Sequence, residues 1–279
     1  MSNPTVFITS QGTRYLKEPG VVLLSKPFVD LSGMAAFLDD LDFGDYLNDP
    51  TELPSGTQLC KTAGQLCYMS FGEKRTKNID AEKYFHNIIS SGHHSVLEHA
   101  NYTFMLYGVS RSLTHELVRH RMFSYSQVSQ RYISGKMLRF VERPEYQNDE
   151  MLHKIFEDRI DRVSSEYASL AYGLLLRQEA GEDILSAELK TDLRKKVNQA
   201  ARSCLPNETE APIVMTGNIR AWRHFLEMRA SEHAETEIRA VAMKVFYLLQ
   251  ATEPILFADY EVVYLADGTE AVRTKYRKV

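Results

Sequence analysis

Several features that mark common protein classes are missing from this sequence. No apolar run approaches the roughly 18 to 20 residues that a membrane span needs. The longest candidates, Val21–Leu24 and Val241–Leu249, are short or broken by Lys244. The first residues lack a basic stretch followed by an apolar one, so we expect no secretory signal and a cytosolic location.

Cysteine is scarce, and glycine-rich nucleotide loops are missing. The three cysteines, Cys60, Cys67 and Cys204, are too few and too irregularly spaced for a disulfide framework or a CxxC metal site. They are predicted to be buried thiols in a reducing compartment. Since the sequence contains no GxGxxG motif and no P-loop, any dinucleotide must bind without those loops.

An excess of positive charge is also missing. The 33 Lys and Arg are outnumbered by 37 Asp and Glu, which gives a formal net charge of −4. This balance argues against a protein that coats nucleic acid, so phosphate binding would depend on local arginines. The hydrophobic fraction of 44% is typical of a folded protein.

Helical and strand patterns are mixed along the chain without the regular alternation of a doubly wound sheet. The sequence therefore predicts a helix-rich α+β fold with a small mixed or antiparallel sheet, as a single domain over residues 1–279. Residues 1–55 are hard to interpret, and residues 39–54 are expected to form a loop. Strands are predicted at 21–24, 101–107, 213–215 and 262–264; helices are predicted after the caps Asp80, Ser110, Asp149, Ser186 and Ser231, and at 221–229.

The segment Arg119–Tyr132 has the most unusual composition, with arginines, serines and glutamines at the end of an amphipathic helix. Guanidinium groups suit phosphate or a carbonyl-rich heterocycle. A solvated polar loop is the alternative, but the apolar Met122, Phe123 and Val128, with Tyr132, are expected to hold this segment against a core. It is therefore a candidate ligand-binding loop.

Histidines suggest a metal site at two places. His94, Glu98 and His99 form one group, and His115 and His120 form another. A zinc HExxH motif needs its histidines four residues apart, whereas this pair is five apart. We therefore predict no metal site and expect histidines that donate or accept hydrogen bonds.

Arg229 lies seven residues after Trp222, close to the apolar stripe of the helix predicted at 221–229. An arginine at this position either forms a buried ion pair, for which several glutamates are nearby, or faces a ligand. Helical geometry leaves both alternatives open. Ser129 lacks the GxSxG pattern of a nucleophile elbow, so nucleophilic catalysis has weak support.

These motifs together resemble the flavin-dependent thymidylate synthases. Arg119-His120-Arg121, followed after seven residues by Ser129, matches their RHRx7S signature. Further matches occur in the same order, over roughly 56–268. They are GHHSVLEH at 92–99, SRSLTHELVRHR at 110–121, AARSCLPNET at 200–209 and TGNIRAWRHFLEMRASEHAE at 216–235. Residues 1–55 then form a variable N-terminal extension.

The resemblance implies reductive methylation of dUMP to dTMP. Methylenetetrahydrofolate supplies the carbon, and FAD, reduced by NADPH, supplies the hydride. It also implies the fold of the thymidylate synthase complementing proteins, assembled as a homotetramer with active sites at subunit interfaces. No nucleic acid or membrane partner is implied.

Residue roles follow by matched position. The resemblance implies that dUMP is bound by Glu116, Arg119, Gln127, Ser129, Arg131, Arg202 and Arg229. It implies that FAD is bound by Ser95, Glu98, His120, Arg121, Asn218, Arg220, His224 and His233, with His93 near the folate and flavin rings. Many family members carry Gln, Glu and Asn where this chain has Glu116, Gln127 and His224.

The implied chemistry requires no protein nucleophile. Arg229 near the N3–O2 edge of uracil would stabilise negative charge there and polarise the C5=C6 bond. None of the cysteines has the Pro-Cys-His context of the unrelated cysteine-dependent enzymes, and Ser129 lacks an evident base, so Ser129 is assigned to binding.

Two alternatives to this function stay open. A single-stranded nucleic-acid binding module could use Phe123, Tyr125 and Tyr132 as stacking groups, although the chain lacks a basic stripe. A flavin-dependent methylation of another pyrimidine acceptor, such as uracil in RNA, would share the same signature.

Overall fold

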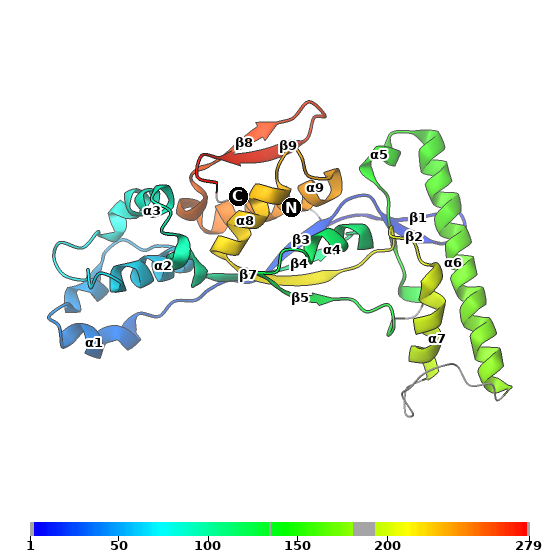
Figure 1. Cartoon of the computed structure of the whole chain (residues 1–279), viewed down its shortest axis with the longest axis horizontal. Coiled ribbons are helices and arrows are strands. Elements are labelled where there is room, and N and C mark those ends of the chain that lie inside the picture. Colours follow the sequence, from blue (N-terminus) through cyan, green and yellow to red (C-terminus); the bar gives the residue numbers. More distant parts are fainter. Residues whose placement is uncertain (1–2, 134, 181–192, 278–279) are drawn as a thin grey trace. The chain divides into compact units, whose positions relative to one another are not determined.

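The computed structural model describes residues 3–133, 135–180 and 193–277, and it mixes helices with small sheets (Figure 1). Within these ranges, no helix combines the length and apolar character that a bilayer crossing requires. The chain divides into two units, each made of discontinuous stretches. The first contains Met1–Gly20, Leu106–Arg119 and Tyr125–Val214, and the second contains Val21–Met105, His120–Ser124 and Met215–Val279.

The first unit combines a small sheet with two neighbouring helices. Its sheet has the order β1-β2-β6, with β1 and β2 antiparallel and β2 and β6 parallel. Helix α6 lies beside α7 (Figure 1). The bounds are β1 Val6–Ile8, β2 Arg14–Leu16, β6 Phe140–Val141, α4 Arg111–Leu117, η5 Gly135–Met137, α5 Pro144–Gln147, α6 Glu150–Glu179, α7 Leu193–Ala201 and η6 Arg202–Cys204.

Two apolar clusters hold this unit together. One buries Phe156, Ile160 and Val163 of α6 against Tyr15 and Phe140 of the sheet. The other buries Tyr167 of α6, Ala201 of α7 and Leu138, and it includes the half-buried Leu205. Helix α7 and the turn that follows it are therefore fixed by the core.

A four-stranded sheet has the order β3-β4-β7-β5. Its bounds are β3 Gly20–Ser25, β4 Asn101–Tyr107, β5 Ser124–Gln127 and β7 Ile213–Asn218. On β4, Tyr102, Phe104 and Leu106 are fully buried, while the residues between them are half-buried or exposed. This alternation arises because successive side chains point to opposite faces of a strand.

The second unit is mainly helical and carries a C-terminal hairpin. Strands β8 and β9 pair antiparallel, and β9 contacts both α8 and α9 (Figure 1). The bounds are η1 Ser32–Met34, α1 Ala35–Asp39, η2 Gly44–Asn48, α2 Ser55–Leu66, η3 Asn78–Asp80, α3 Ala81–Ser90, η4 His94–Glu98, α8 Ile219–Arg229, α9 Thr236–Thr252, η7 Pro254–Phe257, β8 Tyr260–Tyr264 and β9 Glu270–Thr274.

The buried carboxylate of Glu253 fixes the start of α2. Its oxygens accept the backbone N–H groups of Gly56 at 2.9 Å and Thr57 at 2.8 Å, and the Thr57 hydroxyl at 2.6 Å. The Tyr102 hydroxyl of β4 also donates to it. One carboxylate at the end of α9 thus satisfies the otherwise unpaired N–H groups of a helix that begins almost 200 residues earlier.

Most of the expected elements are confirmed. Strand β4 and the strand near Val21 are as predicted, and Ser110 and Asp149 cap α4 and α6 by accepting N–H groups at 3.0 Å and 2.9 Å. Helix α9 ends before Pro254, as predicted. The predicted helix start at Ser186 and its apolar Leu189 lie outside the described residues.

Other expectations were wrong. Residues 39–54 include the 3-10 helix η2, the polar segment after Arg119 contains strand β5, and α9 begins after Glu235. Ser231, the predicted cap, instead donates its hydroxyl to the carbonyl of Met228 at 3.5 Å. Strands β1, β2, β6 and β9 and helix α2 were not expected, because short strands carry a weak pattern and the buried face of α2 consists mainly of small and polar residues.

The expected burial of several side chains was also wrong. Cys60 is buried, but Cys67 is exposed and Cys204 is half-buried. Met122 and Tyr132, which were expected to pack on a core, are 72% and 65% exposed. Phe123 does pack as expected, with its ring 4.6 Å from that of Trp222.

Candidate functional site

A cavity of about 320 Å³ lies in the second unit, between η4 and α8. Half of the residues expected to bind FAD line it: Glu98, Asn218, Arg220 and His224. The Arg220 guanidinium donates to the Glu98 carboxylate, and both side chains are close to half exposed. The structure thus brings four residues from two separate sequence motifs to one cavity.

Helix α8 presents these groups because of how it begins. The Asn218 side-chain oxygen accepts the N–H of Ala221 at 2.9 Å, which caps the helix. One α-helical face then carries Arg220 and His224, four residues apart. The opposite stripe contains Trp222 and Phe225, both fully buried, as the sequence predicted. The buried stripe therefore fixes the direction of the cavity-lining face.

Residues that sequence reasoning did not assign to the site also line this cavity: His94, Met122, Ala221, Arg223 and Glu227. Arg223 and Glu227 follow Arg220 by three and seven residues, so helical spacing could have identified them. The buried His94 ring nitrogen Nε2 lies 3.1 Å from the carbonyl of Ile89. Among the described residues, no group of three His, Cys, Asp or Glu side chains is arranged to hold a metal ion.

His120 lies against α8, next to His224. Its ring centroid is 5.8 Å from that of His224 and 5.4 Å from that of Phe225. Arg229 donates its Nε–H to His120 Nε2 at 3.0 Å. Burial, together with the positive charge of Arg229 and with His224, lowers the pKa of His120 to about 4. At neutral pH the ring is uncharged, and Nε2 acts as an acceptor.

Two arginines of α8 have different surroundings. Arg223 is buried and donates to both carboxylate oxygens of Asp259, at 2.8 Å and 2.7 Å, and to the carbonyl of Leu256. Arg229, the last residue of α8, is half-buried and contacts His120. The nearby Glu232 carboxylate accepts from Arg273 at 2.9 Å.

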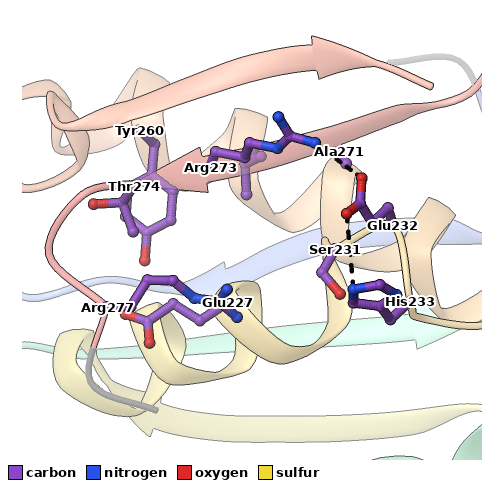
Figure 2. A pocket seen from close by; sticks show the side chains of 10 residues that line it. Glu227, Ser231, Glu232, His233, Tyr260, Ala271, Arg273, Thr274 and Arg277 are labelled. Atoms are coloured by element: carbon purple, nitrogen blue, oxygen red, sulfur yellow. Dashed lines mark hydrogen bonds and ion pairs between the residues drawn. The ribbon is translucent and has the colours of Figure 1, made fainter.

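The other expected FAD residues of this unit do not line the cavity. Ser95 lies within η4 and is exposed, as is Arg121. His93, which was expected near the folate and flavin rings, precedes η4 and is also exposed. His233 lines a separate cavity of about 190 Å³ near β9 (Figure 2). Its side chain is 88% exposed and lies 3.7 Å from Glu232. Glu227 lines both cavities.

The first unit contains every residue expected to bind dUMP except Arg229: Glu116, Arg119, Gln127, Ser129, Arg131 and Arg202. Gln127 ends β5, and the next residue, Val128, donates its N–H to the carbonyl of Pro212 at 2.9 Å. The Ser129 hydroxyl accepts the backbone N–H of Arg131 at 3.4 Å. This pairing closes a tight turn, so Ser129 has a local structural partner in addition to any ligand.

Helix α7 packs beside this turn and leads to Arg202. The Arg131 guanidinium lies 5.9 Å from the centre of the Tyr132 ring, and Lys195 Nζ of α7 lies 5.5 Å from it. Asn198 of α7 donates to the carbonyl of Ile133 at 2.9 Å. Cationic side chains therefore gather where the turn meets α7, and Arg202 follows in η6.

Comparison with known proteins identifies relatives over most of the chain. The family described as "Thymidylate synthase complementing protein" matches residues 50–255. A flavin-dependent thymidylate synthase of Mycobacterium tuberculosis (strain ATCC 25618 / H37Rv) is 47% identical over 221 residues, which are 79% of this chain and 86% of that protein. The enzyme of the same name from Mycobacterium sp. (strain KMS) is 45% identical over 225 residues, 80% of this chain and 87% of the relative.

A solved structure shares the fold at lower sequence identity. It is Thymidylate Synthase X (ThyX) from Helicobacter pylori with FAD and dUMP, 20% identical, with a TM-score of 0.52. The match covers 86% of this chain and 98% of that one. With the family match over 50–255 and relatives 47% identical, this chain belongs to the thymidylate synthase complementing protein family.

Proposed function

We propose that this chain is a flavin-dependent thymidylate synthase, a methyltransferase that converts dUMP to dTMP. The observation that carries the proposal is the 47% identity, over 79% of the chain, to enzymes of that name. Methylenetetrahydrofolate would supply the carbon, and NADPH would supply the electrons. The cytosolic location expected from the sequence stays a prediction.

The cavity between η4 and α8 has the donors that a flavin dinucleotide needs. Arg220 and His224 offer N–H groups suited to phosphate or ribityl oxygens, and Asn218 can offer its Nδ2 because its oxygen caps α8. Bound FAD would supply the hydride. A cavity of about 320 Å³ is near the lower limit of small-ligand pockets, so it would enclose only part of a dinucleotide.

The arginines of the first unit suit the phosphate of dUMP. Arg131 and Arg202 lie on two segments that pack together, and guanidinium forks bind phosphate oxygens in pairs. Ser129, Gln127 and Glu116 supply hydroxyl, amide and carboxylate groups that can fix the orientation of a nucleotide. Local arginines thus offset the acidic net charge of −4.

Arg229 would activate the pyrimidine. A guanidinium at the N3–O2 edge of uracil stabilises the negative charge that develops there and polarises the C5=C6 bond. No thiol is needed for this step, and burial raises the pKa of Cys60 to about 12, which keeps it protonated. Ser129 would bind substrate rather than attack it.

We further propose a homotetramer with shared active sites. The cavity in one chain is too small for the whole dinucleotide, and His233 lies outside it. Contacts from a second chain would complete the enclosure of FAD, so that the flavin and dUMP contacts of one site come from different chains.

The test supplies purified protein with FAD, NADPH, methylenetetrahydrofolate and dUMP and measures dTMP by mass spectrometry. We expect product that disappears when FAD or NADPH is omitted. Arg229→Ala should lower the rate by about 10²- to 10³-fold while the protein still binds FAD and unfolds cooperatively on heating.

A yellow, folded protein that makes no dTMP would overturn the assignment of dUMP and direct the search to another pyrimidine acceptor. A colourless protein with salt-sensitive affinity for oligonucleotides would instead favour a single-stranded nucleic-acid binding module.

A further inference from the structure

The contact between His120 and Arg229 joins a neutral acceptor to a charged donor. Arg229 Nε donates to His120 Nε2 at 3.0 Å. Because the guanidinium group is planar and rigid, an acceptor that holds Nε–H restricts the directions in which the two terminal nitrogens can point. Hydrogen bonds to a charged group are among the stronger ones in proteins.

The position of His120 is itself fixed by the core. The residue is 8% exposed, and its ring packs edge-on against Phe225, which is fully buried in α8. Three residues later, the ring of Phe123 packs 4.6 Å from that of Trp222. Segment 120–123 is therefore held against α8 at both ends, and the acceptor nitrogen has little freedom to move.

The surroundings also keep His120 in the state that can accept. Arg229 and His224, which both come from α8, are among the charged or titratable groups that face it. A second proton on the ring would remove the acceptor and place two positive charges side by side. Burial and these neighbours disfavour that proton, so the pKa of His120 falls to about 4.

We propose that His120 is a positioning residue, whose neutral Nε2 orients the guanidinium of Arg229 toward the pyrimidine of the substrate. This inference rests on the proposed function, because it takes Arg229 as the group that meets uracil. If His120 instead only contacted the flavin, the effect of replacing His120 would be independent of Arg229.

A double-mutant cycle separates the two roles. His120→Phe keeps an aromatic ring against Phe225 but removes the acceptor, and His120→Gln replaces Nε2 with an amide oxygen at a similar reach. Arg229→Lys keeps the charge but lacks Nε. Each change is made alone and paired, and dTMP turnover, dUMP affinity and FAD affinity are measured on the intact FAD-loaded enzyme.

We expect His120→Phe to lower kcat/KM for dUMP by about 10- to 100-fold, a loss larger than any loss of FAD affinity that the flavin contact implied for His120 would cause. His120→Gln should recover most of that loss. In the Arg229→Lys background, His120→Phe should have little further effect, because the acceptor has lost its donor. His99→Phe, at an exposed histidine outside the proposed site, is the control and should match the unmodified enzyme.

Multiplicative losses in the double variant, or a fall in FAD affinity that accounts for the whole loss, would overturn the positioning role. If His120→Phe does not fold, His120→Leu takes its place in the cycle. Failure of the proposed function is distinguishable, because the unmodified enzyme would then make no dTMP at all.

Discussion

Arg223 and Arg229 show, at the scale of single residues, how two like side chains on α8 acquire different roles. Arg223 is enclosed by Asp259, the carbonyl of Leu256 and the ring of Tyr260, whose centroid is 4.7 Å from the guanidinium. Arg229 donates to an uncharged histidine. The Asp259 carboxylate offsets the positive charge of Arg223, whereas the His120 ring that accepts from Arg229 carries no charge of its own.

The cysteines should be dispensable for catalysis. Cys60 is buried with a pKa raised to about 12 by desolvation, and Cys67 is exposed. We expect the triple variant with Cys60→Ala, Cys67→Ser and Cys204→Ser to keep dTMP turnover within about threefold, because no thiolate takes part. Turnover by mass spectrometry and bound FAD by absorbance test this. Complete inactivation of a folded, FAD-loaded triple variant would support a thiol mechanism.

His120 should make stability depend on pH. In the unfolded chain its pKa returns to about 6.5, whereas burial, Arg229 and His224 hold it at about 4 in the folded chain. Between these values the unfolded state binds more protons, so stability falls as pH drops from about 6.5 to about 4, by at most about 1.4 kcal/mol per pH unit.

Urea unfolding of the unmodified protein and of His120→Gln at pH 7 and pH 5 measures this contribution. The unmodified protein should lose more stability between the two pH values than the variant, since glutamine does not titrate. Equal losses in the two proteins would contradict a low folded-state pKa.

At the scale of elements, the sequence predicts those whose side chains repeat clearly. The alternation of Tyr102, Phe104 and Leu106 identified β4, and the stripe of Trp222 and Phe225 identified α8. Strand β5 was interpreted as a loop because its polar residues alternate between half-buried and exposed, which gives little hydrophobic signal. Its pairing in the four-stranded sheet, and not its composition, makes it a strand.

The site was predictable to a similar degree. The family resemblance implied four of the nine residues that line the α8 cavity, but the sequence could not identify the pairing of Arg220 with Glu98 or the contact of Arg229 with His120. These contacts join residues more than 100 positions apart, and only the folded chain brings them together.

Replacing either of two glycines by alanine should change the stability of the protein, in opposite directions at the two positions. A Cβ on Gly217 of β7 would overlap the ring of Phe123, which is itself packed on Trp222. Gly217→Ala should therefore lower the free energy of unfolding by about 1–3 kcal/mol. A Cβ on Gly173 of α6 would meet no side chain within 4 Å, so Gly173→Ala should stabilise by about 0.5–1 kcal/mol.

Chemical unfolding of both alanine variants beside the unmodified protein provides the measurement. A Gly217→Ala variant as stable as the unmodified protein would mean that the Phe123 ring moves without penalty. A destabilised Gly173→Ala variant would mean that α6 needs the glycine for a contact in the assembled protein.

At the scale of the whole molecule, the residues expected to meet the two ligands are divided between the two units. Glu116, Arg119, Gln127, Ser129, Arg131 and Arg202 lie in the first unit, and the expected FAD residues lie in the second with Arg229. Each unit combines stretches that are far apart in sequence, so neither set can be isolated by truncating the chain.

If active sites are shared between chains, co-expression of two differently defective variants should restore part of the activity. Arg131→Ala should impair dUMP binding, and His224→Ala should impair FAD binding. If one site takes these residues from different chains, random assembly of the two variants restores about a quarter of the sites. Turnover of the co-expressed pair, compared with each variant alone, measures this. Activity no greater than the two separate values would mean that each site takes both residues from one chain.

The Glu253 carboxylate that caps α2 has a consequence for biosynthesis. Because the ribosome synthesises the chain from the N-terminus to the C-terminus, Gly56 and Thr57 are made long before Glu253, whose carboxylate accepts their N–H groups. Nascent chains that stall before residue 253 therefore keep the first turn of α2 unsecured and sensitive to proteolysis. Completion of this helix therefore waits for the synthesis of residue 253, almost 200 residues after the helix itself.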